Sequence, residues 1–239
     1  MPSPQQLATV EFGAVAPITG VLFDFHATLV DQGDAQEWVD RALARAPHDL
    51  SSIERTRLTT FLDRIWENAR VHDPHSSRDL SFSAHRAVFH TLLANGPTVD
   101  PTLADALYEV LLDTWHAYAD TLPMLRQLKQ AGISIAVLSN AGVPIRTVLD
   151  REGITPWIDA AVISYEVGVV KPDPRIFQAA LDALGIGAAN ALMVGDSATD
   201  DIGGSALGIR TLILPRTKGS VHGLDVVTRM VLGDTGPGH

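Results

Sequence analysis

The chain lacks cysteine, long apolar runs and an excess of positive charge, and each absence excludes a class of protein. With no cysteine among its 239 residues, it forms no disulfide and has no thiolate metal site or cysteine nucleophile. No uninterrupted apolar stretch reaches the ~18 residues that a membrane helix needs, so we expect no membrane partner. Residues 1–17 have no basic region followed by an apolar one and do not resemble a secretory signal. We therefore expect a cytoplasmic protein.

Basic residues are outnumbered by acidic ones, with 18 Lys and Arg against 28 Asp and Glu, which gives a formal net charge of −10. A surface of that sign repels nucleic-acid backbones and lacks the clustered basic face that phosphate neutralisation requires. We therefore expect no nucleic-acid partner. A small anionic substrate stays open, because one local lysine and a metal ion outweigh a distant negative surface.

Five short apolar runs predict buried strands at residues 20–25, 133–139, 160–165, 191–195 and 210–214. Each run is uniformly apolar rather than alternating, as expected when helices cover both faces of a parallel sheet. Helical patterns separate the later four runs, including one over residues 121–130 and one that opens at Asp173-Pro174. This alternation predicts an α/β fold with a doubly wound, Rossmann-like parallel sheet.

A long insertion separates the first two predicted strands, which lie about a hundred residues apart, whereas one crossover needs far fewer. Residues 32–118 carry helical patterns: Ser51 and Glu54 fit a capping box, and apolar residues from Ile53 to Trp66 recur at helical spacing. We predict an all-α cap domain at 32–118 inserted into an α/β core. The core would comprise residues 18–31 and 119–232, and the termini, 1–17 and 233–239, would be flexible.

Polar residues follow four of the predicted strands at their carboxyl ends, where the functional groups of open parallel sheets collect. They are Asp24, Ser139 with Asn140, Lys171 after a short loop, and Asp196. Asp24 supplies a carboxylate that can attack phosphorus or carbon. Asp196 and Asp201 add hard oxygen ligands suited to Mg²⁺. Lys171 neutralises the nucleophile and a transferring phosphoryl group, while Ser139 and the amides of the turn at 140–142 would meet an anion at a helix start.

The chain resembles the haloacid dehalogenase superfamily of hydrolases, with a helical cap inserted after the first motif. Four motifs in family order carry this resemblance: Asp24-Phe-His-Ala-Thr28, Leu138-Ser139-Asn140, Lys171-Pro172-Asp173-Pro174, and Gly195-Asp196-Ser197-Ala-Thr-Asp200-Asp201-Ile202-Gly203. The resemblance implies that Asp24 is the nucleophile and that Lys171 acts beside it. It also implies that the phosphate or substrate contacts are made by Thr28, Ser139, Asn140 and Lys171. Mg²⁺ would be bound by Asp24, the backbone carbonyl of His26 and Asp196, with Asp201 in support.

His26 departs from the family pattern, since phosphatases of the family carry a second aspartate there. In those enzymes this aspartate protonates the leaving alcohol and then deprotonates the attacking water, and its backbone carbonyl contacts the metal. Imidazole is a competent acid and base near neutrality, so His26 is a candidate for the same catalytic role. The alternatives are altered chemistry and an idle site.

Three functions remain open. The first is a Mg²⁺-dependent phosphatase that acts on a small phosphorylated metabolite through an aspartyl-phosphate on Asp24. The second is a metal-independent, dehalogenase-like hydrolase, which the non-acidic residue at position 26 favours and the Gly195-Asp196 pair disfavours. The third is a catalytically idle binding protein that has kept the fold. In each case the chain would act as a monomer or a homodimer.

Two further expectations concern the cap. Arg70, Arg78, His85 and Arg86 would line the cap face over the site. Trp66 and Trp115 lie on apolar stripes and are expected to belong to the core rather than to a substrate platform.

Overall fold

The computed structural model describes residues 16–31 and 33–233. Five parallel strands form one sheet in the order β3-β2-β1-β4-β5. The strands are β1 (Gly20–Phe23), β2 (Ser134–Ser139), β3 (Ala160–Ile163), β4 (Ala191–Gly195) and β5 (Arg210–Ile213). All five predicted strands are present, and the predicted α/β class with a Rossmann-like parallel sheet is confirmed. The expected flexible termini fall largely outside the described residues.

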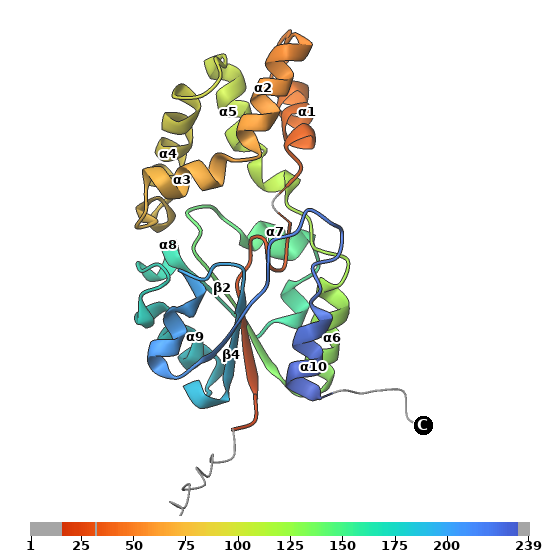
Figure 1. The fold of residues 1–239 in the computed structure, drawn as a ribbon, viewed down its shortest axis with the longest axis vertical. Helices are drawn as coiled ribbons and strands as arrows, with labels where there is room; N and C mark the ends of the chain where they lie inside the picture. Colours follow the sequence, from red (N-terminus) through yellow and green to blue (C-terminus); the bar gives the residue numbers. More distant parts are fainter. Residues whose placement is uncertain (1–15, 32, 234–239) are drawn as a thin grey trace, which may run out of the picture.

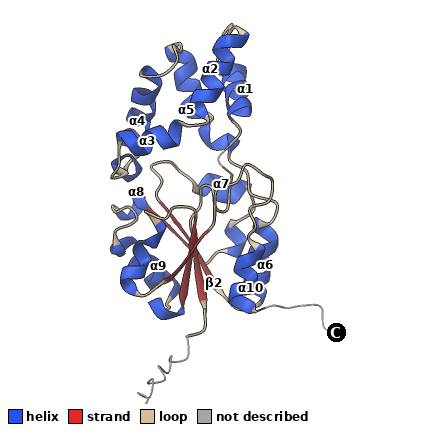
Figure 2. Ribbon diagram, in the orientation of Figure 1, coloured by secondary structure: helices blue, strands red, loops and turns tan. Residues whose placement is uncertain are grey.

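Helices cover both faces of this sheet, as Figures 1 and 2 show. On one face lie α6 (Thr121–Gln130) and α10 (Asp225–Leu232), and on the other lies α9 (Pro174–Leu184). Val21 and Phe23 of β1 face the first group while Leu22 packs with α9, because successive strand residues point to opposite faces. Burial on both faces explains why the strands read as unbroken apolar runs.

The remaining elements of the core are short and connect the strands. They are α7 (Arg146–Arg151), α8 (Ser164–Val167) and the 3-10 helices η3 (Thr155–Trp157), η4 (Ala188–Asn190) and η5 (Asp201–Leu207). The predicted cap on α9 is present, since the Asp173 side chain accepts a hydrogen bond from the Arg175 amide at 2.9 Å and Pro174 is the first helical residue.

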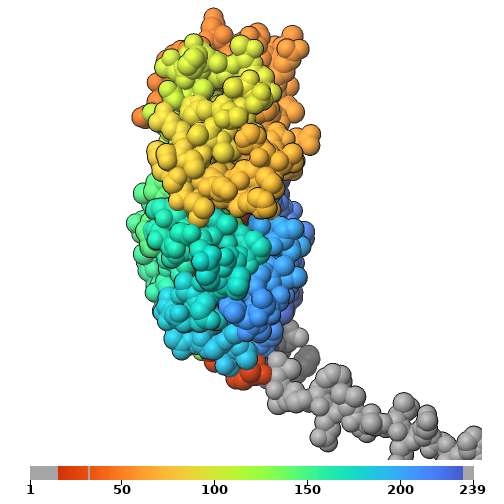
Figure 3. Space-filling model, turned by 90° about the vertical axis from the view of Figure 1, so that its left-hand side faces the viewer, coloured from red at the N-terminus to blue at the C-terminus, as the bar shows by residue number. Residues whose placement is uncertain are grey.

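The segment between β1 and α6 is helical and sits over the carboxyl edge of the sheet. It contains α1 (Ala35–Arg45), α2 (Ser52–Leu62), α3 (Ile65–His72), η1 (Ser77–Leu80), α4 (Phe82–Ala94), α5 (Pro101–Glu109) and η2 (Leu111–Thr114). We call α1 to α5 with η1 the cap. Trp38 anchors its interior by donating from Nε1 to the Leu107 carbonyl at 2.7 Å and packing on Phe89. In space-filling view the cap rests directly on the core (Figure 3).

One helical expectation for this segment was wrong. The apolar residues from Ile53 to Trp66 do not share one helix, because Asp63 and Arg64 separate the end of α2 from the start of α3. Ile53 is 63% exposed, whereas Leu58 and Leu62 are buried. The change of direction between α2 and α3 places Trp66 beside Trp38 and His85. The centroid of its ring lies 6.4 Å from that of Trp38 and 5.3 Å from that of His85. Within the described part of the chain, no helix has the length and apolar character needed to cross a membrane.

Candidate active site

A pocket lies between the carboxyl edge of the sheet and the cap. Its core side is lined by Asp24, His26, Ser139, Asn140, Ala141, Val143, Lys171, Asp196, Ser197, Asp200, Asp201 and Arg216. Its cap side is lined by Trp66, Arg70, Ser76, Arg78, Asp79 and His85, and Trp115 closes it near the connection between the two parts. Of the site residues predicted on the core side, all but Thr28 lie on these walls. Four distant motifs therefore meet in one place.

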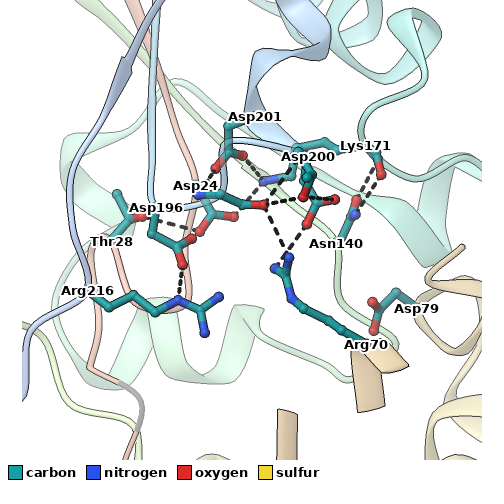
Figure 4. A network of polar contacts seen from close by, with 12 residues as sticks. Asp24, Thr28, Arg70, Asp79, Asn140, Lys171, Asp196, Asp200, Asp201 and Arg216 are labelled. Carbon is teal, nitrogen blue, oxygen red and sulfur yellow. Dashed lines mark hydrogen bonds and ion pairs between the residues drawn. The ribbon is translucent and has the colours of Figure 1, made fainter. Parts of the chain in front are cut away.

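Asp24 and Lys171 form the centre of the site (Figure 4). Asp24 follows β1 directly, and its amide donates to the Val194 carbonyl at 2.8 Å, which fixes its backbone to the neighbouring strand. The Lys171 ammonium lies 2.6 Å from Asp24 Oδ1, and both side chains are buried. Thr28 Oγ1 donates to Asp24 Oδ2 at 3.3 Å. Thr28 thus touches the nucleophile candidate rather than the pocket.

Asn140 holds the backbone of Lys171. Its side-chain nitrogen, Nδ2, donates to the Lys171 backbone carbonyl at 3.0 Å, and its Oδ1 accepts from the Lys171 backbone amide at 2.7 Å. This two-point contact explains why a residue of the second motif is needed to place the lysine of the third. A direct contact of Asn140 with substrate stays a prediction.

Three carboxylates converge beside Lys171. Asp24, Asp196 and Asp201 each offer an oxygen, and these oxygens lie within 4.8 Å of one another. Asp201 Oδ1 accepts from Lys171 at 2.7 Å and its Oδ2 from the Ser197 amide at 2.9 Å, while Asp196 pairs with Arg216. Any side chain at Gly195 would overlap the Asp201 carboxylate, so the glycine is what lets Asp201 enter the cluster. Oxygen donors of this type and spacing fit Mg²⁺.

The electrostatics of the cluster also favour an added cation. Burial raises the pKa of Asp24 to about 7, against the opposing effect of Lys171, and the neighbouring Asp201 and Asp196 raise it further. Burial alone would lower the Lys171 pKa, but Asp201 and Asp24 outweigh it and hold that pKa above its ordinary value. A divalent ion would favour the ionised form of Asp24 that nucleophilic attack requires.

His26 lies on the pocket wall beside Trp115, with ring centroids 4.5 Å apart. Trp115 is almost fully buried, and it also contacts Phe25 at 6.2 Å. The expectation that Trp66 and Trp115 serve only as core residues was incomplete, because both line the pocket. Aromatic faces in a pocket wall lower the local dielectric, which strengthens charge interactions beside them.

The cap contributes charged groups as well. Arg70 donates to Ser197 Oγ at 3.2 Å and pairs with Asp200 at 3.0 Å, which ties α3 to the core. Arg78 is buried and pairs with Asp79 at 3.3 Å. Arg70, Arg78 and His85 line the pocket as predicted. Arg86 does not, because it pairs with Asp105 at the cap surface.

The turn at residues 140–142 differs from its prediction. It does not start a helix, since α7 begins only at Arg146. Its glycine instead allows close approach of the cap: a Cβ on Gly142 would lie 2.5 Å from the Arg78 carbonyl oxygen and 2.8 Å from the His85 Cβ. Ser164 adds a second tie by donating to the Asp79 carbonyl at 2.6 Å.

Three charged lining residues were missed by sequence reasoning: Arg216, Asp200 and Asp79. Arg216 follows β5 by three residues, so the same strand-end argument that found Asp24 would have found it. Asp79 lies on a cap turn that carries no transferable motif.

The sequence profile of the haloacid dehalogenase-like hydrolases matches residues 18–208. The chain belongs to this family. (S)-2-haloacid dehalogenase 1 of Pseudomonas sp. (strain CBS-3) is 28% identical over 210 residues, or 84% of this chain and 86% of that enzyme. Glyceraldehyde 3-phosphate phosphatase of Methanopyrus kandleri is 36% identical over 143 residues, or 57% of this chain. The chain spans 61% of that phosphatase, which is less than two thirds of its length.

The fold agrees with solved structures of this family. The crystal structure of a HAD phosphatase from Thermococcus onnurineus matches with a TM-score of 0.60 at 22% identity, over 90% of this chain and 98% of that one. One of the two relatives is named a haloacid dehalogenase and the other a phosphatase. Membership therefore establishes the hydrolase family, and the choice of leaving group depends on the site.

Proposed function

We propose that this hydrolase is a Mg²⁺-dependent phosphatase acting on a small phosphorylated metabolite through an aspartyl-phosphate on Asp24. The observation that carries the proposal is the cluster of Asp24, Asp196 and Asp201 around Lys171. A nucleophile that attacks carbon needs no such set of hard oxygen ligands, whereas phosphoryl transfer depends on metal and lysine charge. We further propose that the enzyme works without nucleic-acid or membrane partners, as a monomer or a homodimer.

Two steps use the residues of this site. The Asp24 carboxylate attacks phosphorus and the bond from phosphorus to the leaving oxygen breaks, while His26 gives its proton to that oxygen and the alcohol departs. Water then attacks the phosphorus of the aspartyl-phosphate and gives a proton to His26, which releases inorganic phosphate and restores Asp24. Lys171 stabilises the negative charge of the transferring group throughout.

Asp24 and Asp196 would hold the Mg²⁺ together with the His26 carbonyl, and Asp201 would support them. When bound, the ion supplies positive charge that offsets the charge on the phosphoryl oxygens. Asn140 keeps Lys171 in place, and the cap excludes water from the pocket.

A dehalogenase is the second candidate, because the match to (S)-2-haloacid dehalogenase 1 extends over 84% of this chain and position 26 holds no aspartate or glutamate. In that reaction Asp24 would attack carbon, halide would leave, and water would cleave the resulting ester without a metal.

One experiment separates the two. Phosphate release from a panel of phosphate monoesters and halide release from 2-chloropropionate are measured with Mg²⁺ and with chelator, for wild type, Asp24→Asn and Asp196→Asn. We expect Mg²⁺-dependent phosphate release that both variants lose. Metal-independent halide release that survives in Asp196→Asn but not in Asp24→Asn, without phosphate release, would establish the dehalogenase instead.

A further inference from the structure

We propose that the pocket selects phosphate monoesters whose remaining part is uncharged and hydroxylated. In this proposal the Arg78–Asp79 pair of the cap rejects substrates that carry a second anionic group. The inference rests on the proposed phosphatase activity and names its substrate class.

Every lysine and arginine on the pocket wall already pairs with a carboxylate of the protein. Among the described residues, the lysines and arginines that line the pocket are Arg70, Arg78, Lys171 and Arg216. Their partners are Asp200 for Arg70, Asp73 and Asp79 for Arg78, Asp24 and Asp201 for Lys171, and Asp196 for Arg216. A substrate carboxylate would therefore have to displace an existing ion pair.

The overall charge leads to the same conclusion. Five carboxylates, four lysine and arginine side chains and the protonated His26 of the proposed mechanism line the pocket, so one Mg²⁺ leaves an excess charge of +2, which equals the charge of a phosphate dianion. The phosphate group of a monoester takes up that charge in full. A second phosphate or a carboxylate would add negative charge to a buried site with nothing to balance it, which is costly in a low dielectric.

Arg78 is a basic residue on the cap side of the pocket wall, and its contacts hold its guanidinium in place. Its Nη1 donates to the Asp73 carbonyl at 3.2 Å and lies 3.5 Å from Asp73 Oδ2, while its Nη2 lies 3.3 Å from Asp79 Oδ2. Arg78 and Asp79 are 8% and 4% exposed. Moving Arg78 to a new anion would leave two carboxylates without their cation, and breaking a buried pair in this way is strongly unfavourable.

Apart from Arg70, the other cap residues on the pocket wall are uncharged. His85 shares a hydrogen bond between Nδ1 and the Tyr108 hydroxyl at 3.0 Å, and burial lowers its pKa to about 3, so its imidazole is neutral. Ser76 adds a hydroxyl and Trp66 an aromatic face. Substrate hydroxyls both donate and accept, so they suit a hydroxyl, a neutral imidazole and the Asp79 carboxylate together. An anion only accepts, and Asp79 repels it.

Arg70 is the competing receptor for an anion, because its guanidinium is 39% exposed and its pair with Asp200 is weak. The test therefore compares phosphates matched in size that differ in one carboxylate: glycerol 1-phosphate with 3-phosphoglycerate, and glucose 6-phosphate with 6-phosphogluconate. We measure kcat and KM with Mg²⁺ at pH 8. Binding is measured separately by titration calorimetry with Asp24→Asn, which removes the nucleophile.

In at least one pair, we expect the member without the carboxylate to be favoured about ten- to a hundredfold in kcat/KM and in affinity. This is the size of the penalty for burying a charge that has no partner. Asp79→Asn should remove one of the two carboxylates that pair with Arg78, together with its repulsion of an anion, and reduce that preference about tenfold, mainly through the KM of the carboxylated member. Asp105→Asn is the matched control, because Asp105 pairs with Arg86 outside the pocket, and it should leave the preference unchanged.

Equal or reversed preference in both pairs would overturn the inference, and so would a preference that Asp79→Asn leaves intact. Phosphate release from carboxylated substrates alone would keep the phosphatase and reject this substrate class. Halide release from 2-chloropropionate without any phosphate release would reject both, since that substrate is itself a carboxylate. If Asp79→Asn does not fold, the kcat/KM ratios of the wild type and the affinities from calorimetry still show whether the carboxylated substrates are disfavoured.

Discussion

The ammonium nitrogen of Lys171 lies 2.6 Å from Asp24 Oδ1, although 147 residues separate the two in the chain. The same nitrogen lies 2.7 Å from Asp201 Oδ1, so one buried cation serves two buried carboxylates. Such a group stabilises the fold only while all its members are present, because a buried charge without a partner is strongly unfavourable. The stability of the fold and the proposed catalysis would therefore depend on the same side chain.

Replacing Lys171 tests its contribution to the stability of the fold. Lys171→Met should lower the free energy of unfolding by about 3–5 kcal/mol in urea titrations, because two carboxylates lose their counter-ion. Lys129→Met is the control: Lys129 also lies 2.7 Å from an aspartate, Asp159, but that pair is partly exposed. It should change stability by no more than about 1 kcal/mol. Equal losses in the two variants would contradict the role of burial.

His26 is the subject of the second prediction. If its imidazole moves the protons, His26→Gln should lower kcat for phosphate release by about 10²–10⁴-fold, the usual contribution of a general acid–base group. His26→Asp should keep turnover and move the pH–rate profile to lower pH, since a carboxyl titrates below an imidazole. The measurement is kcat against pH with saturating Mg²⁺. A fully active His26→Gln enzyme would show that another group carries the protons.

The third prediction concerns the contact of the cap with Gly142. Gly142→Ala would place a methyl group 2.5 Å from the Arg78 carbonyl oxygen, so the cap must move away from the core. We expect kcat/KM to fall by about 10²-fold, because displacements of this order disrupt substrate alignment. Gly187→Ala offers the matched control, as its nearest neighbour would be Asn190 Oδ1 at 3.8 Å. Undiminished activity of Gly142→Ala would show that the cap need not approach so closely.

Asp79 allows a prediction about pH. Burial raises its folded-state pKa to about 7, above the ordinary value of 3.8, so between these values the folded protein binds more protons than the unfolded chain. The stabilisation that this provides is complete below about pH 4 and is lost as the pH rises through about 7. The stability of wild type minus that of Asp79→Asn should therefore fall by a few kcal/mol, on the order of the linkage for such a shift, from pH 5 to 8. Urea titrations at several pH values provide the measurement, and a difference that rises with pH would contradict it.

Much of the core side of the site could be predicted from the sequence because parallel strands end at one edge. Asp24, Lys171 and Asp196 were predicted both as polar residues that follow apolar runs and as members of the family motifs, and the structure brings them together in one pocket. Arg216 obeys the same rule and was overlooked. These positions depend on local pattern and topology, which a sequence displays directly.

The cap side could not be predicted in the same way. Trp66 reaches the pocket because the helix is interrupted at Asp63 and Arg64, and no proline or glycine in the sequence marks that interruption. Asp79 reaches it because Gly142, on a different part of the chain, leaves room for the turn that carries it. Both effects come from packing between segments that are distant in sequence, so helical periodicity within the cap does not contain them.

The order of the strands has a consequence for how the protein folds during synthesis. β1 lies in the middle of the sheet, and both of its neighbours come from much later in the chain: Gly20 pairs with Ser134 on one side and with Ala191 on the other. The strand that leads into Asp24 thus leaves the ribosome first and acquires its two neighbours last, after the whole helical insertion has been made. Long-range pairing of this kind is slow and exposes apolar edges meanwhile. A nascent chain halted within the insertion would present an unpaired apolar strand, and would be a client for chaperones.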